Sequence, residues 1–353
     1  MPFWYVYPIW HRVSFTLVAR KHLEHLKRSI RIEEVDELAF PHISPHSRPI
    51  VVLHPFFFMM MRASRQISRR LHRYGALIGI DVADSDRISG LAVSMTNYAH
   101  AMIVPSTFSQ RAFVASGVQV QVHVVPHGLD AEWYVAERGR TRYFDDLRRL
   151  RERRRVKLIL FFLWHSDYRK GADLVLSWYR ELRRERRDVL LVVKTVGEYS
   201  ELVARAKDYG VVHVRGWLTE EQKMELYDLA DLYPLFSRGG GFEMNGLEAL
   251  ARLVPVIAAQ GGSWEDYMPP WLLVESRRTR WVLKDNPIHV GGGVEVDVSK
   301  AVDKAHWVLD NLDDVRARLA EHRAQRLYME FRWDRAAERI LSILLETKQK
   351  LGL

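Results

Sequence analysis

The chain has 353 residues, of which 48% are hydrophobic, so it is long enough for about two domains with sizeable cores. The absence of cysteine excludes disulfides, thiolate nucleophiles and cysteine-ligated metals. A net charge of +9 favours anionic partners without choosing among them, and the arginine-rich composition is compatible with a thermophilic source. Because no apolar run reaches the roughly 20 residues that span a bilayer, and the N-terminus lacks the pattern of a signal peptide, we expect a cytoplasmic protein.

Strand-like and helix-period segments alternate along the chain, which predicts an α/β fold with mainly parallel sheets. In residues 1–130 we expect strands at 3–9, 49–53, 76–81, 101–105 and 121–125, and helices at 14–28, 57–74, 88–98 and 109–116. In residues 155–330 we expect strands at 157–163, 189–194, 211–214, 232–236 and 254–258, and helices at 172–184, 199–208, 220–230 and 245–252. Two Rossmann-like, doubly wound domains facing a cleft fit this pattern.

Two further segments complete the predicted organisation. Residues 131–154 form a linker crowded with arginine, either a solvated helix or a basic face for a membrane or an acidic partner. After residue 300 the chain is expected to be helical to its end, with a break near 331–334 and a last helix over 331–353.

A triple-glycine turn at 239–241 is the most informative feature of the sequence. It lies between a predicted strand and a predicted helix that opens near Asn245, and glycine leaves the backbone bare for a ligand. The N–H groups at a helix start attract anions, most often phosphate, and Glu248 in this helix is positioned to bind a sugar hydroxyl. The alternative is an ordinary tight turn without a ligand.

A second loop, Arg169-Lys170-Gly171, follows the first predicted strand of the second domain. Loops after parallel strands lie at the carboxyl edge of the sheet, where ligands of such folds bind. Two adjacent cations there can pair with a diphosphate. Together with the glycine turn, this loop predicts a diphosphate clamp, whereas an Arg-Lys pair alone is weak evidence in a chain this basic.

Several segments, in the same order, resemble family 4 of the retaining, nucleotide-sugar glycosyltransferases, which have the GT-B fold. They are Val124-Val-Pro-His-Gly-Leu-Asp130, Arg169-Lys-Gly171, Gly216-Trp-Leu-Thr-Glu-Glu221 with Leu226-Tyr-Asp-Leu-Ala-Asp231, residues 237–257, and Phe331-Arg-Trp-Asp-Arg-Ala-Ala-Glu338. The last is similar to a closing helix that crosses back to the first domain. The resemblance covers about residues 105–345.

The resemblance implies a role for each matching residue. Glu248 matches the second glutamate of the family's E-x7-E pair and would bind the nucleotide ribose. The backbone of Gly241 and Phe242 would face the donor, and Lys170 with Arg169, ahead of Gly171, would neutralise the leaving diphosphate. We therefore count Gly240, Gly241, Phe242, Glu248, His165 and Gly171 as candidate donor-binding residues, and Lys170, Arg169, Glu243 and Asp84 as candidate catalytic residues.

The sequence also departs from the family. The first glutamate of E-x7-E falls on Gly240, and Glu243 is the candidate substitute. His165 falls near the family's arginine and would contact a phosphate or be structural. In the first domain, Pro8-Ile-Trp-His11-Arg12 replaces the glycine loop, and His54 is more simply structural. Asp84 lies where an aspartate could bind the sugar or take the acceptor proton, although helix capping by Ser85 or Asp86 explains the segment equally well.

The segment 56–73 combines the apolar run Phe56-Phe-Phe-Met-Met-Met61 with five arginines. It is either a core helix with a solvated basic side or a helix that touches an anionic membrane surface.

These observations favour a retaining hexosyltransferase that uses a nucleoside-diphosphate sugar and needs neither a metal nor another cofactor. Its acceptor would be a glycan or a lipid-linked sugar, and no specific nucleic-acid partner is expected. The alternatives are a degenerate, non-catalytic protein that binds a nucleotide sugar, glycan or polyanion, and a GT-B nucleotide-sugar epimerase or phosphorylase.

Overall fold

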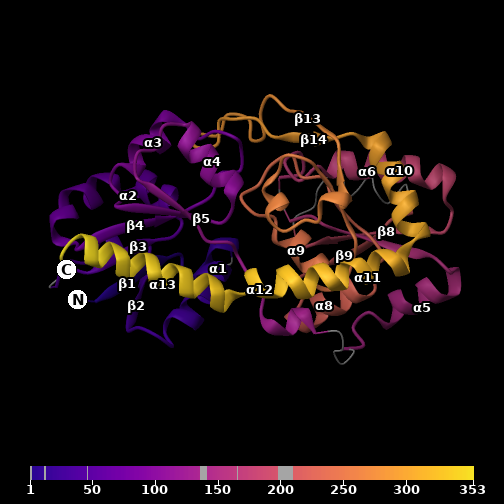
Figure 1. Ribbon diagram of the computed structural model, residues 1–353, viewed down its shortest axis with the longest axis horizontal. Coiled ribbons are helices and arrows are strands. Elements are labelled where there is room, and N and C mark those ends of the chain that lie inside the picture. The colour runs from indigo at the N-terminus through magenta and orange to yellow at the C-terminus, as the bar shows by residue number, and fades with distance from the viewer. Residues whose placement is uncertain (1, 12, 46, 136–140, 165, 198–209) are drawn as a thin grey trace. The chain divides into compact units, whose positions relative to one another are not determined.

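The computed structural model describes residues 2–11, 13–45, 47–135, 141–164, 166–197 and 210–353. The chain forms two compact units: Met1–Gly128 with Leu283–Gly291 and Glu330–Leu353, and Leu129–Val282 with Gly292–Met329 (Figure 1). The C-terminal segment therefore returns to the first unit. The sequence predicted that residues 283–291 lie in the second domain, whereas in the structure they belong to the first unit.

The first unit is built on a six-stranded parallel sheet of order β2-β1-β3-β4-β5-β6. Its strands are β1 (Phe3–Tyr7), β2 (Ile32–Asp36), β3 (Ile50–Leu53), β4 (Ala76–Ile80), β5 (Ala101–Val104) and β6 (Gln121–Val124). Its helices are α1 (Ser14–Leu26), α2 (Phe56–Arg70), α3 (Gly90–Thr96), α4 (Thr107–Ala115) and α13 (Trp333–Lys350), with short turns η1 (Phe40–His42) and η2 (Leu71–Arg73). Strands β1, β3 and β4 are buried along their whole length, as expected for the centre of a parallel sheet.

The structure corrects three expectations in this unit. Strand β2 was not predicted, because only Ile32 and Val35 in it are both apolar and buried. Helix α3 begins at Gly90 rather than at residue 88, and Ser89 caps it by accepting from the Ala92 amide at 3.1 Å. Capping by Ser85 or Asp86 was therefore wrong. Helix α2 ends at Arg70 and has non-helical backbone at Ala63.

The second unit contains two three-stranded parallel sheets that a bridge between Ile159 and Leu232 joins, giving the order β9-β8-β7-β10-β11-β12. The strands are β7 (Lys157–Phe162), β8 (Val189–Thr195), β9 (Val212–Arg215), β10 (Tyr233–Leu235), β11 (Val256–Ala259) and β12 (Leu273–Val274), with an antiparallel pair β13 (Ser276–Arg278) and β14 (Val294–Val296). This is the strand order of a Rossmann fold.

The remaining elements of the second unit are mainly helical. They are α5 (Asp145–Arg154), α6 (Ala172–Glu185), α8 (Glu220–Asp228), α9 (Met244–Ala251), α10 (Val298–Asp310) and α11 (Leu312–His322), the turns η3 (Ala131–Tyr134), η5 (Ser263–Asp266) and η6 (Pro270–Leu272), and the π-helix η7 (Arg323–Leu327). The helix expected at 199–208 lies outside the described residues.

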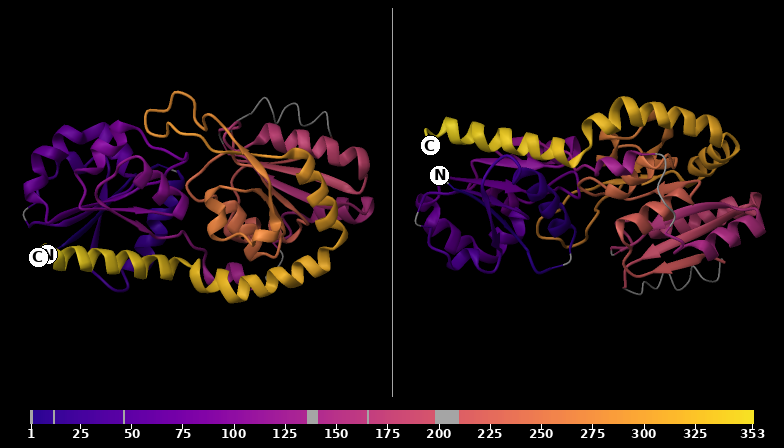
Figure 2. Two further views of the ribbon diagram at one scale, coloured as in Figure 1. Left: turned by 45° about the horizontal axis from the view of Figure 1, so that its top comes forward. Right: turned by 90° about the horizontal axis from the view of Figure 1, so that it is seen from below.

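The expected break in the C-terminal helices is confirmed. Short helix α12 (Tyr328–Glu330) is followed by α13, which begins at Trp333. Figure 2 shows α13 in yellow along the first unit, where it packs against α1. The Trp333 ring lies edge-on to His22 of α1, with 5.8 Å between the ring centroids.

Two arginines of the basic linker pair with carboxylates of the second unit. Arg151 of α5 donates to both oxygens of Asp231 at 2.8 and 2.9 Å, and Arg148 lies 3.3 Å from Glu225. Arg149, Arg153 and Arg154 remain exposed. Helix α5, at the end of the linker, is thus packed by two of its arginines, and its other arginines are exposed to solvent. No helix in the described part of the chain is long and apolar enough to cross a membrane.

Candidate functional site

The candidate site lies in the second unit, between β7 and β10. The crossover from β7 runs through α6 to β8 on one side, whereas that from β10 runs through α9 to β11 on the other. Ligands of doubly wound sheets bind at such a switch point, outside the carboxyl ends of the strands. The two loops that leave this point are bonded together, since the Arg238 amide and the Ser237 hydroxyl donate to the Arg169 carbonyl at 2.7 and 3.1 Å.

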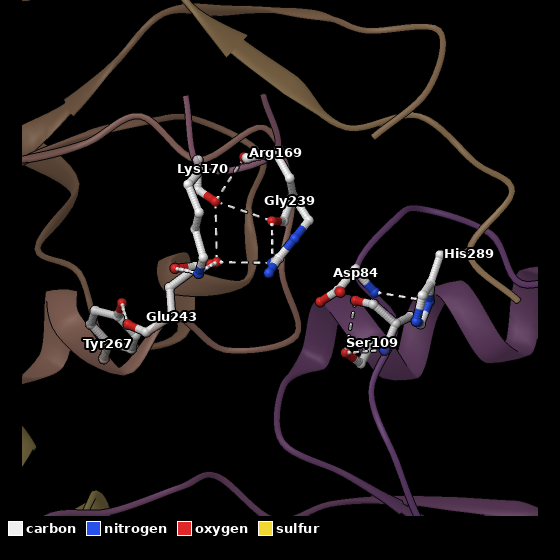
Figure 3. A network of polar contacts seen from close by, with 10 residues as sticks. Asp84, Ser109, Arg169, Lys170, Gly239, Glu243, Tyr267 and His289 are labelled. Atoms are coloured by element: carbon white, nitrogen blue, oxygen red, sulfur yellow. Dashed lines mark hydrogen bonds and ion pairs between the residues drawn. The ribbon is translucent and has the colours of Figure 1, made fainter. Parts of the chain in front are cut away.

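Glu243 is the centre of a buried polar cluster in these loops (Figure 3). Lys170 donates to both of its carboxylate oxygens, at 2.6 and 2.7 Å, and the Ser237 hydroxyl oxygen lies 3.1 Å from Oε1. Arg169 lies 3.6 Å away and donates to the Gly239 carbonyl at 3.3 Å. The site thus brings two cations and one carboxylate to the start of α9, as the glycine turn and the Arg-Lys loop predicted.

The backbone of Glu243 is in the left-handed region, with φ of 65°. Such a conformation costs a non-glycine residue about 1–3 kcal/mol and persists only where the surroundings hold it. The Tyr267 hydroxyl supplies one such contact by donating to the Glu243 carbonyl at 2.6 Å. The polar cluster around the carboxylate supplies the rest.

Gly240 leaves room for this carboxylate. A Cβ atom at position 240 would collide with Oε1 of Glu243, while no neighbour other than Glu243 stands among its nearest contacts. The Glu243 carboxylate therefore fills the space where a side chain at 240 would begin. The Glu243 carboxylate thus lies directly beside Gly240, the residue on which the resemblance expects a glutamate.

Gly171 serves the packing of the two loops. It has φ of +67°, and a Cβ atom there would collide with the carbonyl oxygen of Phe236 at the end of β10. Only glycine combines this backbone angle with so close an approach. Gly171 thus allows the turn that carries Lys170 to lie against the glycine turn.

Glu248 lies one turn into α9 and is buried. Its carboxylate pairs with Lys223 of α8 and accepts from the Tyr227 hydroxyl at 2.8 Å. Burial alone would lower the pKa of Lys223, but the carboxylates of Glu248 and Glu220 outweigh it and raise that pKa. Glu220 in turn accepts from the Trp133 indole N–H at 3.2 Å. Lys223 and Tyr227 were missed in the sequence, because a lysine and a tyrosine in a helix carry no signal of a distant partner.

Lys194 ends β8 near the same edge of the sheet. Its ammonium group is buried and donates to the carbonyl oxygens of Thr195, at 2.8 Å, and Gly216. Burial, helped by the charge of Lys223, lowers the pKa of Lys194 to about 8. This lysine holds the loops after β8 and β9 together, and its charge depends on pH close to the physiological range.

Comparisons with known proteins agree with this geometry. The family described as glycosyl transferases group 1 matches residues 145–286, which contain both loops. Uncharacterized protein 356 of Sulfolobus islandicus rod-shaped virus 1 is 36% identical over 329 residues, 90% of this chain and 91% of that protein. Residues 145–286 thus match the glycosyl transferases group 1.

The chain is also similar in sequence to a mannosyltransferase and in fold to several solved structures. The GDP-mannose-dependent alpha-(1-6)-phosphatidylinositol monomannoside mannosyltransferase of Mycolicibacterium smegmatis is 29% identical over 181 residues, 47% of this chain and 46% of that protein. The N-terminal domain of Candida albicans trehalose-6-phosphate phosphatase is 13% identical with a TM-score of 0.69, over 98% of this chain and 97% of that one. The expected GT-B fold is confirmed by this and similar structures.

Asp84 belongs to the first unit, in the loop after β4. Its backbone amide donates to His289 Nδ1 at 3.3 Å, and the neighbouring Ser85 hydroxyl accepts from the Gly291 amide at 3.1 Å. Residues 283–291 thus hold the loop that carries Asp84, which no sequence pattern revealed. Asp81, by contrast, is buried and accepts from the Phe57 amide at 2.6 Å, so it anchors the start of α2.

The other first-unit candidates are explained by their contacts. His54 is buried, and its Nδ1 shares the Tyr5 hydroxyl with His22, at 2.9 and 2.8 Å. His11 lies 3.6 Å from Glu37. Arg12 of the first unit and His165 of the second unit lie outside the described residues. Within the described residues, no group of three or more His, Asp or Glu side chains is placed to hold a metal ion.

Proposed function

We propose that the protein transfers a hexose, with retention of configuration, from a nucleoside-diphosphate sugar to a hydroxyl group. The observation that carries this proposal is the Lys170–Glu243 cluster at the switch point, opposite Gly240 and at the N-terminus of α9. It supplies cations for a diphosphate and a carboxylate for a sugar at one place. The match of residues 145–286 to the glycosyl transferases group 1 supports glycosyl transfer as the reaction class.

Each residue has a proposed role. Lys170 and Arg169 neutralise the diphosphate as its bond to the anomeric carbon breaks, together with the backbone amides of Gly241 and Phe242 at the start of α9. These charges do the work of a metal, so we propose that none is required. Lys170 binds the Glu243 carboxylate in this structure. When a diphosphate binds, the Lys170 ammonium group pairs with the phosphate instead, and the Glu243 carboxylate becomes available to the sugar hydroxyls.

Glu248 is the proposed ligand of the ribose hydroxyls. Lys223 and Tyr227 hold its carboxylate in one orientation, so ribose binding requires little rearrangement. Asp84 is the proposed acceptor-side residue. It would accept the proton of the attacking hydroxyl as that oxygen bonds to the anomeric carbon on the face from which the diphosphate leaves.

The donor to test first is GDP-mannose, because a mannosyltransferase that depends on it is a relative over 181 residues. The name of that mannosyltransferase gives a phosphatidylinositol monomannoside as its acceptor, which supports a lipid-linked or glycan acceptor for this protein. The thermophilic source and cytoplasmic location expected from the sequence stay predictions.

Peripheral contact with an anionic membrane belongs to the same proposal. The inner side of α2 buries Phe56, Phe57, Met59 and Met60, whereas Phe58 and Met61 are each 49% exposed. Arg62, Arg65 and Arg69 are exposed on the same helix. Exposed apolar side chains beside arginines suit insertion into an anionic lipid surface.

The test combines binding with transfer. Thermal unfolding is measured with UDP, GDP, ADP and dTDP for the native protein and for Lys170→Ala, and the matching sugar nucleotides are then assayed with glycan and lipid-linked acceptors. We expect one diphosphate to raise Tm, the variant to lose most of that shift, and NMR of the product to show the donor's anomeric configuration. Hydrolysis or epimerisation of the donor without an acceptor, or binding of a diphosphate without turnover, would instead identify one of the alternative functions.

A further inference from the structure

A second cationic feature lies on α6, away from the switch point. The helix starts at the Lys170 loop, at the carboxyl edge of the sheet, and its last turns approach the opposite edge, from which β8 begins (Figure 1). Arg180, Arg183, Arg184 and Arg187 line a pocket there with Tyr179. We call this the α6 pocket.

The four arginines of the α6 pocket make no ion pair with a carboxylate in the described part of the chain. Arg183 donates to the Val189 carbonyl at 2.9 Å, which fixes its side chain but leaves its charge unbalanced. Arg186, on another side of the helix, shows the contrast, since it pairs with Asp188 at 2.9 Å and with Asp310. The four-residue spacing of Arg180 and Arg184 within α6 places two like charges next to each other, and these charges repel.

Tyr179 supplies an independent observation at the same place. The residue is fully buried, and its hydroxyl group has no hydrogen-bond partner within the parts of the chain that the structure describes. Buried hydroxyl groups nearly always have a partner, so one without any needs an explanation. Here the hydroxyl belongs to a residue that lines a pocket with four arginines, whose side-chain N–H groups can only donate.

We propose that the α6 pocket binds a phosphate group. Guanidinium groups bind phosphate oxygens with charge-assisted and often bidentate hydrogen bonds, and a phosphate oxygen would accept from the Tyr179 hydroxyl. The pocket, at about 200 Å³, is smaller than the roughly 300–1,000 Å³ of most small-molecule sites, so it suits one phosphate group rather than a sugar nucleotide. The proposal does not rest on the transferase reaction, because the pocket shares no residue with the donor site.

The experiment is titration calorimetry of inorganic phosphate into the full chain, at constant ionic strength, for matched double variants. Arg180→Gln with Arg184→Gln removes two charges from the pocket, and the control, Arg153→Gln with Arg154→Gln, removes two exposed charges from α5. We expect the control to bind like the parent and the pocket variant to bind at least about tenfold more weakly, since tenfold corresponds to one modest charge-assisted bond. Equal affinity in both variants would overturn the proposal.

Tyr179→Phe provides a second variant that keeps the packing and removes only the hydroxyl group. We expect it to unfold at the same Tm as the parent or higher, and to bind phosphate several-fold more weakly. Unchanged phosphate affinity in a folded Tyr179→Phe protein would contradict the role given to the hydroxyl. Repeating the titration with a short single-stranded oligonucleotide distinguishes the sources of phosphate: tighter, arginine-dependent binding of the oligonucleotide indicates a phosphodiester chain, and binding of inorganic phosphate alone indicates a free ion.

Discussion

The carboxylate of Glu243 occupies the space into which a side chain at Gly240 would project. Lys170 holds that carboxylate with both of its oxygens bonded. A carboxylate three residues later in the chain is thereby held beside the residue at which the family resemblance expects one. The left-handed backbone at Glu243 is what turns the side chain back.

The first prediction concerns the Glu243 carboxylate beside Gly240. Gly240→Ala should lower the rate of sugar transfer on the order of 100-fold, the size typical of losing one electrostatic contact to the transition state, because the methyl group displaces the Glu243 carboxylate. Initial-rate kinetics with the identified donor measure it. Gly90→Ala is the control, since a Cβ atom there meets nothing within 4 Å. Gly240→Glu combined with Glu243→Gly should recover part of the rate, and no recovery in a folded double variant would argue against equivalence of the two positions.

Glu248 is predicted to contribute to nucleotide affinity. Glu248→Gln keeps the shape of the side chain but removes the charge that Lys223 and Tyr227 orient, so the Kd of the nucleoside diphosphate should rise about tenfold, as expected for one lost charge-assisted bond. Calorimetric titration measures the change. Glu321→Gln, an exposed change on α11, should leave the Kd as it is. A variant at 248 that binds the nucleotide as the parent does would remove Glu248 from the site.

Gly171→Ala should destabilise the protein. Its φ of +67° costs alanine about 1–3 kcal/mol, and the collision with the Phe236 carbonyl adds to this. Urea unfolding followed by circular dichroism gives the free energy. Gly197→Ala serves as the comparison, because a Cβ atom there has open space and no positive φ, so it should change stability by less than about 1 kcal/mol. Equal effects at both sites would contradict the packing role of Gly171.

The buried His54 should make the first unit sensitive to acid. Burial, followed by the influence of His127, lowers the pKa of His54 to about 3, whereas an unfolded histidine titrates near 6.5. The unfolded state therefore takes up a proton that folded His54 excludes, and the stability present above pH 6.5 is lost as pH falls toward 3. Between pH 7.5 and 5.5 this loss is about 1.4 kcal/mol for one histidine.

Comparison with His54→Asn isolates this effect, because asparagine can still accept from the Tyr5 hydroxyl but does not titrate. The difference in unfolding free energy between parent and variant should shrink by that amount over the two pH units. A difference that stays constant with pH would mean that His54 has an ordinary pKa.

The exposed side of α2 is predicted to bind anionic lipid. Phe58→Ser with Met61→Ser should reduce binding to phosphatidylserine-containing vesicles on the order of 100-fold or more, because each apolar side chain buried in the lipid contributes about 1.5–3 kcal/mol. Vesicle sedimentation measures it. Leu91→Ser with Val114→Ser changes two other exposed apolar residues of the first unit and should have no effect. Equal binding by all three proteins, or binding to neutral vesicles alone, would reject a membrane role for α2.

Much of this protein could be predicted from the order of its residues. Apolar runs with turn signals between them predicted most of the strands and helices, since buried parallel strands and amphipathic helices impose distinct periods on the sequence. Strands β2, β12, β13 and β14 were not predicted. The glycine turn and the Arg169-Lys170 loop were singled out because they follow predicted strand ends, and Glu248 because it lies in the helix after the glycine turn. The edge strand β2 escaped prediction because it buries too few apolar side chains to show a period.

The partners of these residues were decided only by the tertiary structure. Glu248 lies 25 residues from Lys223 in the chain, and Lys170 lies 73 residues from Glu243. Such contacts follow from which strands are adjacent, and strand order is a property of the folded sheet rather than of any local segment. The sequence by itself determined which residues carry chemistry. Folding determined that Glu243 fills the space at Gly240, because that depends on one backbone angle and on the lysine that crosses from the neighbouring loop.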